Sequence, residues 1–330
     1  MVSVVNVGLL HRATSPSKRG VLIVGSGNIV HNLRATMDGQ PEGLRGLTDW
    51  ADGFDQSVRA ALEAGFTHIA YQMEPIAAAL DYEQRVAHET TALVVDIGGG
   101  TSDFTVIRLN PARSAQSDRT ADILATTGVH IGGTDFDRLL DLATVMPYLG
   151  YKHVGTGGRI VPSSVFFDLS TWHLIHQAYT RKSMHFAKEL WTDYTDQALH
   201  RRLMDALEEQ HGHRMLASVE AAKIACSISG DSAVVELGFL DRSLAPTVDA
   251  ANMEAALHAS LAQVVQCAQD CVAAAGLQAV DAVYLTGGSS ALRTLIAALR
   301  QAMPLAKLVE GNRFGGVAAG LAWAGAVHPY

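Results

Sequence analysis

Cysteine is scarce in this chain, and the few present are not arranged for disulfides or metal binding. The 330 residues contain three cysteines, Cys226, Cys267 and Cys271, and none of their spacings matches a metal-binding pair. Cys267 and Cys271 lie one helical turn apart, which favours core packing over ligation. So few thiols, with no signal peptide, are typical of a protein from a reducing cytoplasm.

Long apolar runs and an excess of positive charge are also missing. No run approaches the ~20 apolar residues that span a bilayer, so we expect no membrane partner. The formal net charge is -8, and a nucleic-acid surface must neutralise phosphates, so we expect no nucleic-acid partner either. The local basic residues Arg201, Arg202 and Arg214 are better explained as a solvated helix face. Hydrophobic residues make up 48%, enough for a large core.

Glycines cluster where strands are expected to end. Residues 92–97 are rich in β-branched side chains, and residues 102–109 alternate back after the glycines at 98–100. This pattern predicts a β-hairpin. A third strand is expected at 121–126, followed by the glycine pair at 132–133 and a helix with an acidic first turn.

The remaining pattern alternates between short strands and longer helical stretches. Ser289 or Ser290 is a plausible N-cap for a helix at 291–303. The other expected elements are strands at 20–24, 69–73 and 281–286, a helix at 76–82 led by Pro75, mainly helical sequence at 140–245 interrupted by glycines at 154–158, and helices at 253–276 and from about 315.

The hairpin glycines carry the chemistry. Three consecutive glycines leave backbone N–H groups uncovered by side chains, forming a nest that can bind phosphate oxygens. Asp96, at the end of the first strand, is placed to hold a metal-bound water, and Thr101 can present a hydroxyl to a terminal phosphate. The alternative is a plain glycine-rich turn, which needs only one or two glycines.

The segment at 96–103 (DIGGGTSD) resembles the second phosphate-binding motif of the actin/hexokinase/heat-shock chaperone superfamily. The nearest match is the DnaK-type (seventy-kilodalton) heat-shock family, within it the short YegD-like proteins. Further segments resemble family motifs in the family's order: the connecting helix at 73–79 (MEPIAAA), the loop at 132–137 (GGTDFD), the E-x-x-K-x-x-x-S spacing of Glu220, Lys223 and Ser227, the adenosine motif at 285–290 (LTGGSS) and the closing helix at 317–320 (VAAG).

The resemblance implies an α/β, actin-like or RNase H-like ATPase fold that binds ATP or ADP with Mg²⁺. It assigns catalytic roles to Glu74, Asp96 and Thr101, and Asp96 would hold Mg²⁺ through water. The implied nucleotide contacts are Gly98, Gly99, Gly100, Thr101, Gly132 and Gly133 for phosphates, and Glu220, Lys223, Ser227, Gly287, Gly288, Ser289 and, one residue out of the family spacing, Arg293 for adenosine.

The resemblance also divides the chain. Residues 61–90 are expected to be a remnant of the first lobe with its connecting helix, and 91–330 the second lobe with a helical insertion at about 134–253. No D-x-G-T hairpin precedes Glu74, so we expect impaired ATP hydrolysis. We also expect no peptide-binding domain, although a protein partner or client is possible. The alternative is a non-catalytic scaffold or interaction protein.

Residues 1–60 are expected to form an atypical N-terminal segment. Within it, residues 19–60 resemble a fragment of the class III extradiol (DOPA-dioxygenase-like) family around G-S-G-x-x-x-H-N-L, with His31 at that family's pocket histidine. This suggests a rearranged gene and, remotely, a dioxygenase remnant, for which His11 and Asp52 would be guessed iron ligands. The alternative of a dinucleotide fingerprint fails because Val30 replaces its third glycine.

Histidine is plentiful, with 14 in the chain. The pair His211 and His213 invites a structural metal site. The histidines are scattered along the sequence, however, and the nucleotide motifs account for the fold without a metal. Ordinary surface and packing roles are the better interpretation.

Overall fold

A computed structural model describes residues 7–13, 21–25, 70–114, 116, 119–311, 316, 317, 319, 320 and 323, with side chains from residue 75 onward. The predictions for the Gly-Ser-Gly turn, His31 and Asp52 lie outside the described residues.

A five-stranded mixed sheet forms the centre of the fold, in the order β10-β9-β4-β5-β6. Its strands are β4 (Thr90–Ile97), β5 (Ser102–Leu109), β6 (Ile123–Val129), β9 (Ala282–Thr286) and β10 (Lys307–Glu310). β4, β5 and β6 run antiparallel in sequence order, whereas β9 pairs parallel to both β4 and β10. The predicted hairpin and the α/β fold class are confirmed. Strand β10 was not predicted.

The strands alternate between two hydrophobic cores, one on each face of the sheet. Leu93, Val95 and Ile97 of β4 belong to the larger core, whereas Ala92 and Val94 belong to the smaller one. This alternation is the period of two that a strand imposes on its side chains. Because both faces are covered, β4 is held in register from both sides.

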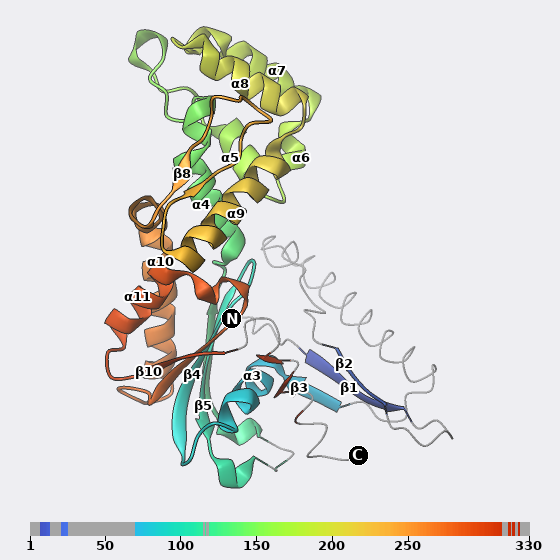
Figure 1. The fold of residues 1–330 in the computed structure, drawn as a ribbon, viewed down its shortest axis with the longest axis vertical. Helices are drawn as coiled ribbons and strands as arrows, with labels where there is room; N and C mark the ends of the chain where they lie inside the picture. Colours follow the sequence, from blue (N-terminus) through green and yellow to red (C-terminus); the bar gives the residue numbers. More distant parts are fainter. Residues whose placement is uncertain are drawn as a thin grey trace, which may run out of the picture.

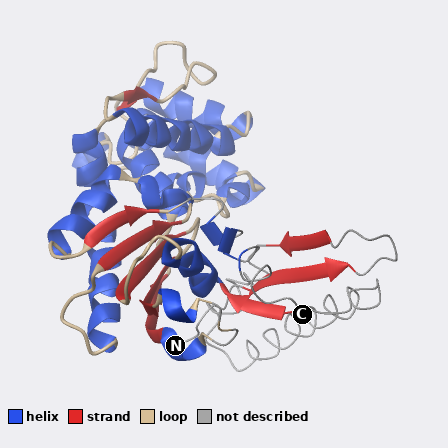
Figure 2. Cartoon of the chain, turned by 60° about the horizontal axis from the view of Figure 1, so that its bottom comes forward, coloured by secondary structure: helices blue, strands red, loops and turns tan. Residues whose placement is uncertain are grey.

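Helices α10 (Ala250–Ala274) and α11 (Arg293–Ala302) pack on the sheet face that carries the larger core. Figure 1 shows both helices beside β10. The mainly helical insertion lies beyond one end of the sheet (Figures 1 and 2). Its elements are α4 (Gly133–Thr144), η3 (Met146–Leu149), η4 (Thr156–Gly158), α5 (Ser164–Ser170), α6 (Ile175–Ala178), α7 (Arg181–Glu189), η5 (Leu190–Asp193), α8 (Gln197–Glu208), α9 (Gly212–Ser229), β7 (Ala233–Val234) and β8 (Thr247–Val248).

Helix α3 (Glu74–Glu83) covers the opposite face with the smaller core. Pro75 occupies its first turn, as predicted. Val317 and Trp323 pack against this core. Two 3₁₀ turns, η1 (Pro111–Arg113) and η2 (Thr120–Asp122), connect β5 to β6.

A second, three-stranded sheet has the order β2-β1-β3, built from β1 (Val7–Ala13), β2 (Val21–Gly25) and β3 (Ala70–Met73), and lies to one side of the larger sheet (Figure 1). Strand β1 was not predicted, and His11 lies on it. The domain boundaries remain predictions.

The predicted N-cap at Ser289 or Ser290 is wrong. The chain makes a 3₁₀ turn, η6 (Gly288–Ala291), and α11 begins only at Arg293, after an N-cap residue, Leu292, that makes no side-chain cap hydrogen bond. The physical reason is local: the Ser290 hydroxyl donates to the Gly287 carbonyl at 2.7 Å and so stabilises the tight turn instead of the helix.

Candidate functional site

A cleft of about 500 Å³ opens where the hairpin loop, α9 and η6 meet. It combines seven of the residues predicted from sequence with five that were not. The predicted ones are Gly98, Gly99, Glu220, Lys223, Ser227, Gly288 and Ser289, and the others are Phe136, Ile224, Ile228, Ala291 and Leu292.

The parallel pairing of β4 and β9 explains why segments about 190 residues apart share this cleft. Asp96 and Thr286 are partners in register, so both strands end at the same edge of the sheet. Each strand is followed by glycines, Gly98 after β4 and Gly287 after β9. Ligands of open α/β sheets bind outside such carboxyl ends.

Hydrogen bonds fix the hairpin loop against the start of α4. The Gly133 N–H donates to the Gly98 carbonyl at 2.9 Å. The Gly99 carbonyl accepts from both the N–H and the hydroxyl of Thr134, each at 2.8 Å. With the loop carbonyls held by α4, the loop is fixed before any ligand arrives.

Gly132 and Gly133 are required by packing. A Cβ on Gly132 would lie 2.6 Å from backbone atoms of Gly99 and Gly100, which cannot move aside as a side chain can. A Cβ on Gly133 would overlap the hydroxyl of Ser289. Their absent side chains let the two loops touch.

Gly287 is required by both conformation and packing. Its φ of +84° is in the region that side chains disfavour. A Cβ there would also overlap a carboxylate oxygen of Asp96 and approach the backbone of Ile97.

Gly99 and Gly100 have no such requirement. Neither has a positive φ, and a Cβ on either would meet nothing within 4 Å. Among the described residues, the structure records no protein acceptor for their two N–H groups, whereas the Gly98 N–H donates to Thr101 at 2.9 Å. Two adjacent glycines are thus left with open space where a side chain would be.

The lysine of the cleft is paired within the protein. Lys223 is 7% exposed, and its Nζ lies 2.7 Å from Oδ1 of Asp137 on α4. Burial raises the pKa of Asp137 to about 6, an effect that Lys223 opposes and Glu220 reinforces. The Ser227 hydroxyl donates to the Lys223 carbonyl at 2.8 Å.

Asp141 lies one helical turn beyond Asp137 and is completely buried. Neither of its carboxyl oxygens has a hydrogen-bond partner among the described residues. Burial first, and the charge of Asp137 second, raise the pKa of Asp141 well above its ordinary value. Burial therefore favours the protonated form of this side chain.

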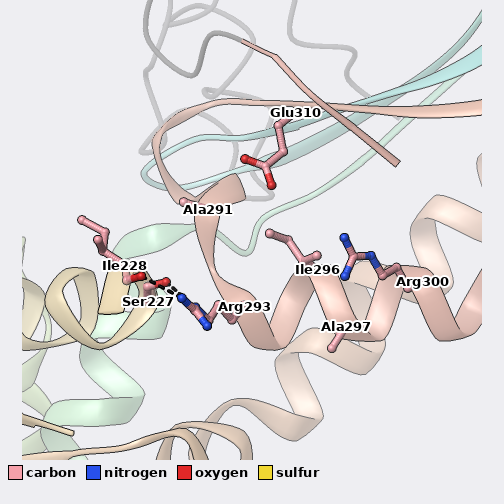
Figure 3. Close-up of a pocket in the computed structure, with 8 residues that line it drawn as sticks. All are labelled: Ser227, Ile228, Ala291, Arg293, Ile296, Ala297, Arg300 and Glu310. Atoms are coloured by element: carbon pink, nitrogen blue, oxygen red, sulfur yellow. Dashed lines mark hydrogen bonds between the residues drawn. The ribbon is translucent and has the colours of Figure 1, made fainter. Parts of the chain in front are cut away.

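Arg293 lies in a neighbouring pocket of about 490 Å³, which shares Ser227, Ile228 and Ala291 with the cleft. Its guanidinium donates to the carbonyls of Ser227 and Ile228, both at 2.7 Å, as Figure 3 shows. The side chain therefore ties the end of α9 to the start of α11. The pocket also contains Arg300.

The structure describes the side chains of two of the three predicted catalytic residues. The Thr101 hydroxyl donates to the Asp103 carboxylate at 2.9 Å, and Thr101 is 8% exposed. Asp96 is half-buried beside Gly287. Glu74 begins α3, but its side chain lies outside the described part of the chain.

Direct metal ligation finds no support within the described residues. They contain no group of three or more His, Cys, Asp and Glu side chains that could hold an ion. His211 instead lies 3.0 Å from Glu209, and His213 packs edge-on against Trp172. A metal held by Asp96 through water, as predicted, does not require such a cluster.

Sequence reasoning missed the roles of Asp137 and Asp141. The sequence does contain a signal for these roles. The two aspartates lie four residues apart, beside Phe136 and Leu140, on a helix that the sequence pattern indicates. An acid in the apolar stripe of a helix needs a partner or a proton, and only the structure shows which one it has.

The mixed sheet and the glycine hairpin together give the α/β fold of the actin-like ATPases. In agreement, residues 56–138 match the family model for MreB/Mbl protein. The chain is also 38% identical over 95 residues to chaperone protein DnaK of Deinococcus deserti, 27% of this chain and 14% of that protein.

Other chaperones give similar matches. Chaperone protein DnaK of Thermosipho melanesiensis is 39% identical over 85 residues, 25% of this chain and 13% of that protein. Chaperone protein HscA of Buchnera aphidicola subsp. Schizaphis graminum is 36% identical over 87 residues, 26% of this chain and 13% of that protein. The chain spans 14% or less of the length of these relatives, and it carries an Hsp70-like segment of the actin fold.

Proposed function

We propose that the cleft binds ATP or ADP with Mg²⁺. The observation that carries this proposal is the open space at Gly99 and Gly100. Neither backbone conformation nor packing within the described chain accounts for glycine at these two positions. A ligand that approaches the backbone closely does account for it, and adjacent uncovered N–H groups favour phosphate oxygens.

The proposal assigns the parts of the nucleotide to the cleft and to the pocket beside it. In this proposal the phosphates lie on the hairpin loop, of which Gly98 and Gly99 line the cleft, while Glu220 and Lys223 face the ribose from α9. The neighbouring pocket beyond Ser227 and Ile228 has room for the base. Asp96 holds Mg²⁺ through water, with Glu74 and Thr101 as the other candidate catalytic residues.

Turnover is expected to be slow. Residues 1–73 contain no D-x-G-T sequence, and phosphoryl transfer depends on groups that position the phosphate from both sides. The proposal is therefore a chaperone-like nucleotide-binding protein with weak ATPase activity, related to the YegD-like proteins. Besides the nucleotide, the proposed partner of this chain is another protein or a client.

The proposed location is the cytoplasm. Cys226, Cys267 and Cys271 are all free thiols, as expected in a reducing compartment. Within the described residues, no helix combines the length and apolar character that crossing a membrane demands.

Isothermal titration calorimetry with ADP and ATP, with and without MgCl₂, tests the proposal. We expect binding that strengthens with Mg²⁺, is weakened by Lys223→Ala, and is accompanied by slow phosphate release. Absence of heat at millimolar nucleotide would refute nucleotide binding and favour the scaffold alternative.

A further inference from the structure

Lys223 lines the proposed nucleotide cleft, yet its charge is directed elsewhere. Its Nζ lies 2.7 Å from Oδ1 of Asp137, and the two side chains are 9% and 7% exposed. This ion pair joins α9 to α4 behind the cleft wall. A ligand that engages the ammonium must compete with a buried carboxylate.

Among the described residues, Lys223 is the only cation that affects the pKa of Asp137. The largest charge effects on Asp137 come from Lys223 and from Glu220, which is itself negative. One turn along α4 lies Asp141, whose carboxyl oxygens have no hydrogen-bond partner among the described residues. A buried carboxylate that loses its only cation is strongly destabilised unless it becomes neutral.

The titratable side chains on the other elements packed against α4 are not among the causes that shift the pKa of Asp137 or of Asp141. β8 (Thr247–Val248) carries no titratable side chain. The titratable side chains of the others are Asp168 on α5, Tyr148 on η3, and Glu254, His258, Cys267, Asp270 and Cys271 on α10.

From this geometry we propose that Asp137 holds Lys223 away from the ligand, and that nucleotide binding through Lys223 is coupled to the uptake of one proton by Asp137. The inference rests on the proposed nucleotide function and adds its regulation. The balance is simple: the Lys223–Asp137 ion pair breaks, the ammonium moves to the oxygens of the nucleotide, and a proton from solvent neutralises the carboxylate. Asp141 takes no part in this exchange, because burial holds its pKa well above the ordinary value.

The sign of the pH dependence follows from linkage. Binding that takes up a proton weakens as pH rises, by up to about tenfold per pH unit, above the pKa of about 6 that Asp137 has in the ligand-free protein. Below that pH the carboxylate is already neutral, Lys223 is already released, and the affinity levels off.

Asp137→Asn separates this coupling from a merely structural role. The amide mimics the protonated acid in shape and charge, so the variant should bind MgADP about thirtyfold more tightly than the wild type at pH 7.5, well above the Asp137 pKa of about 6. Loss of a structural contact would instead weaken binding. Asp205→Asn on α8 is the matched control, since it removes the same charge outside the cleft.

Calorimetry with MgADP from pH 5.5 to 8.0, in pairs of buffers with different ionisation enthalpies, measures affinity and proton uptake together. The wild type and Asp205→Asn should take up close to one proton more than Asp137→Asn at pH 7.0 to 7.5. Titration of the nucleotide phosphate is common to all three proteins and cancels in the comparison.

Equal proton uptake in the wild type and Asp137→Asn, or weaker binding by the variant at pH 7.5, would overturn the coupling while leaving nucleotide binding intact. No binding by any protein at any pH would overturn the proposed function, and the coupling with it. If Asp137→Asn fails to fold, the wild type alone decides: an affinity for MgADP that does not fall between pH 6.5 and 8.0 refutes the proposal.

Discussion

Replacing single glycines around the cleft separates residues needed for folding from residues needed for the ligand. Gly99→Ala adds a methyl group where nothing lies within 4 Å, and at a φ that alanine accepts. The folded state should lose no stability and gain about 0.4–1 kcal/mol, because alanine restricts the unfolded chain. Gly132→Ala adds its methyl group 2.6 Å from backbone atoms of Gly99 and Gly100. Such overpacking costs about 1–3 kcal/mol.

The two variants should therefore behave in opposite ways in two assays. Thermal unfolding followed by circular dichroism should show Gly132→Ala melting about 2–12 °C below the wild type, whereas Gly99→Ala melts at or above it. Calorimetry with MgADP should show Gly99→Ala losing at least one charge-assisted hydrogen bond, about 1.5–3 kcal/mol, or about 10–150-fold in affinity.

The reasoning fails if Gly99→Ala binds MgADP as the wild type does, because the open space would then have no ligand to explain it. It also fails if Gly99→Ala melts as low as Gly132→Ala. Gly238→Ala is the matched control for the substitution itself, since a Cβ there also meets nothing within 4 Å and the residue lies outside the cleft lining.

Two further predictions concern buried ionisable side chains outside the lining of the cleft. Arg119→Met removes the guanidinium that bonds Glu83 and Asp122, and all three side chains are 3% exposed or less. The variant should be destabilised by about 3–5 kcal/mol in urea unfolding. The control Arg108→Met, at an exposed ion pair, should change stability by less than about 0.5 kcal/mol. Asp141→Asn should flatten the pH dependence of stability. Because the pKa of Asp141 is raised in the native state, the unfolded state loses this proton first, above about pH 4, and the wild type then loses up to about 1.4 kcal/mol of stability per pH unit. Urea unfolding at pH 5.0, 6.0 and 7.0 should show a smaller loss in the variant. Identical pH slopes for the two proteins would show that Asp141 is charged in the native state.

The sequence predicted those parts of the site that depend on local pattern. The alternation at 92–97 and 102–109 and the glycines between them indicate a hairpin, because strand period and turn chemistry are properties of neighbouring residues. The spacing of Glu220, Lys223 and Ser227 likewise indicates one helix face. The cleft contains all three.

Contacts between distant elements could not be predicted in this way. Helical periodicity places Lys223 on a face of α9, but it does not say that Asp137 of α4 lies 2.7 Å from its Nζ. In the same way, nothing in the residues near Arg293 indicates that its guanidinium bonds the end of α9. Such pairs are set by how helices pack across the fold.

The wrong N-cap has a different cause. Ser289 and Ser290 have the residue type of a helix N-cap, and their hydroxyls can equally stabilise a turn. Gly287 has a φ of +84° and admits the tight 3₁₀ turn that follows β9, which moves the start of α11 to Arg293. The competing turn is only four residues long, too short for a periodic pattern to reveal.

Strand β4, packed on both faces, has a consequence for the energetics of ligand binding. A loop that must be ordered on binding subtracts about 1–2 kcal/mol of backbone entropy for each residue fixed. The loop at 98–100 continues directly from a strand that two cores hold, and α4 already bonds its carbonyls. The ordering cost has therefore been met during folding. In hydrogen exchange we expect the amides of β4 to be among the slowest in the five-stranded sheet, and nucleotide to protect the loop amides by direct contact without slowing the strand further.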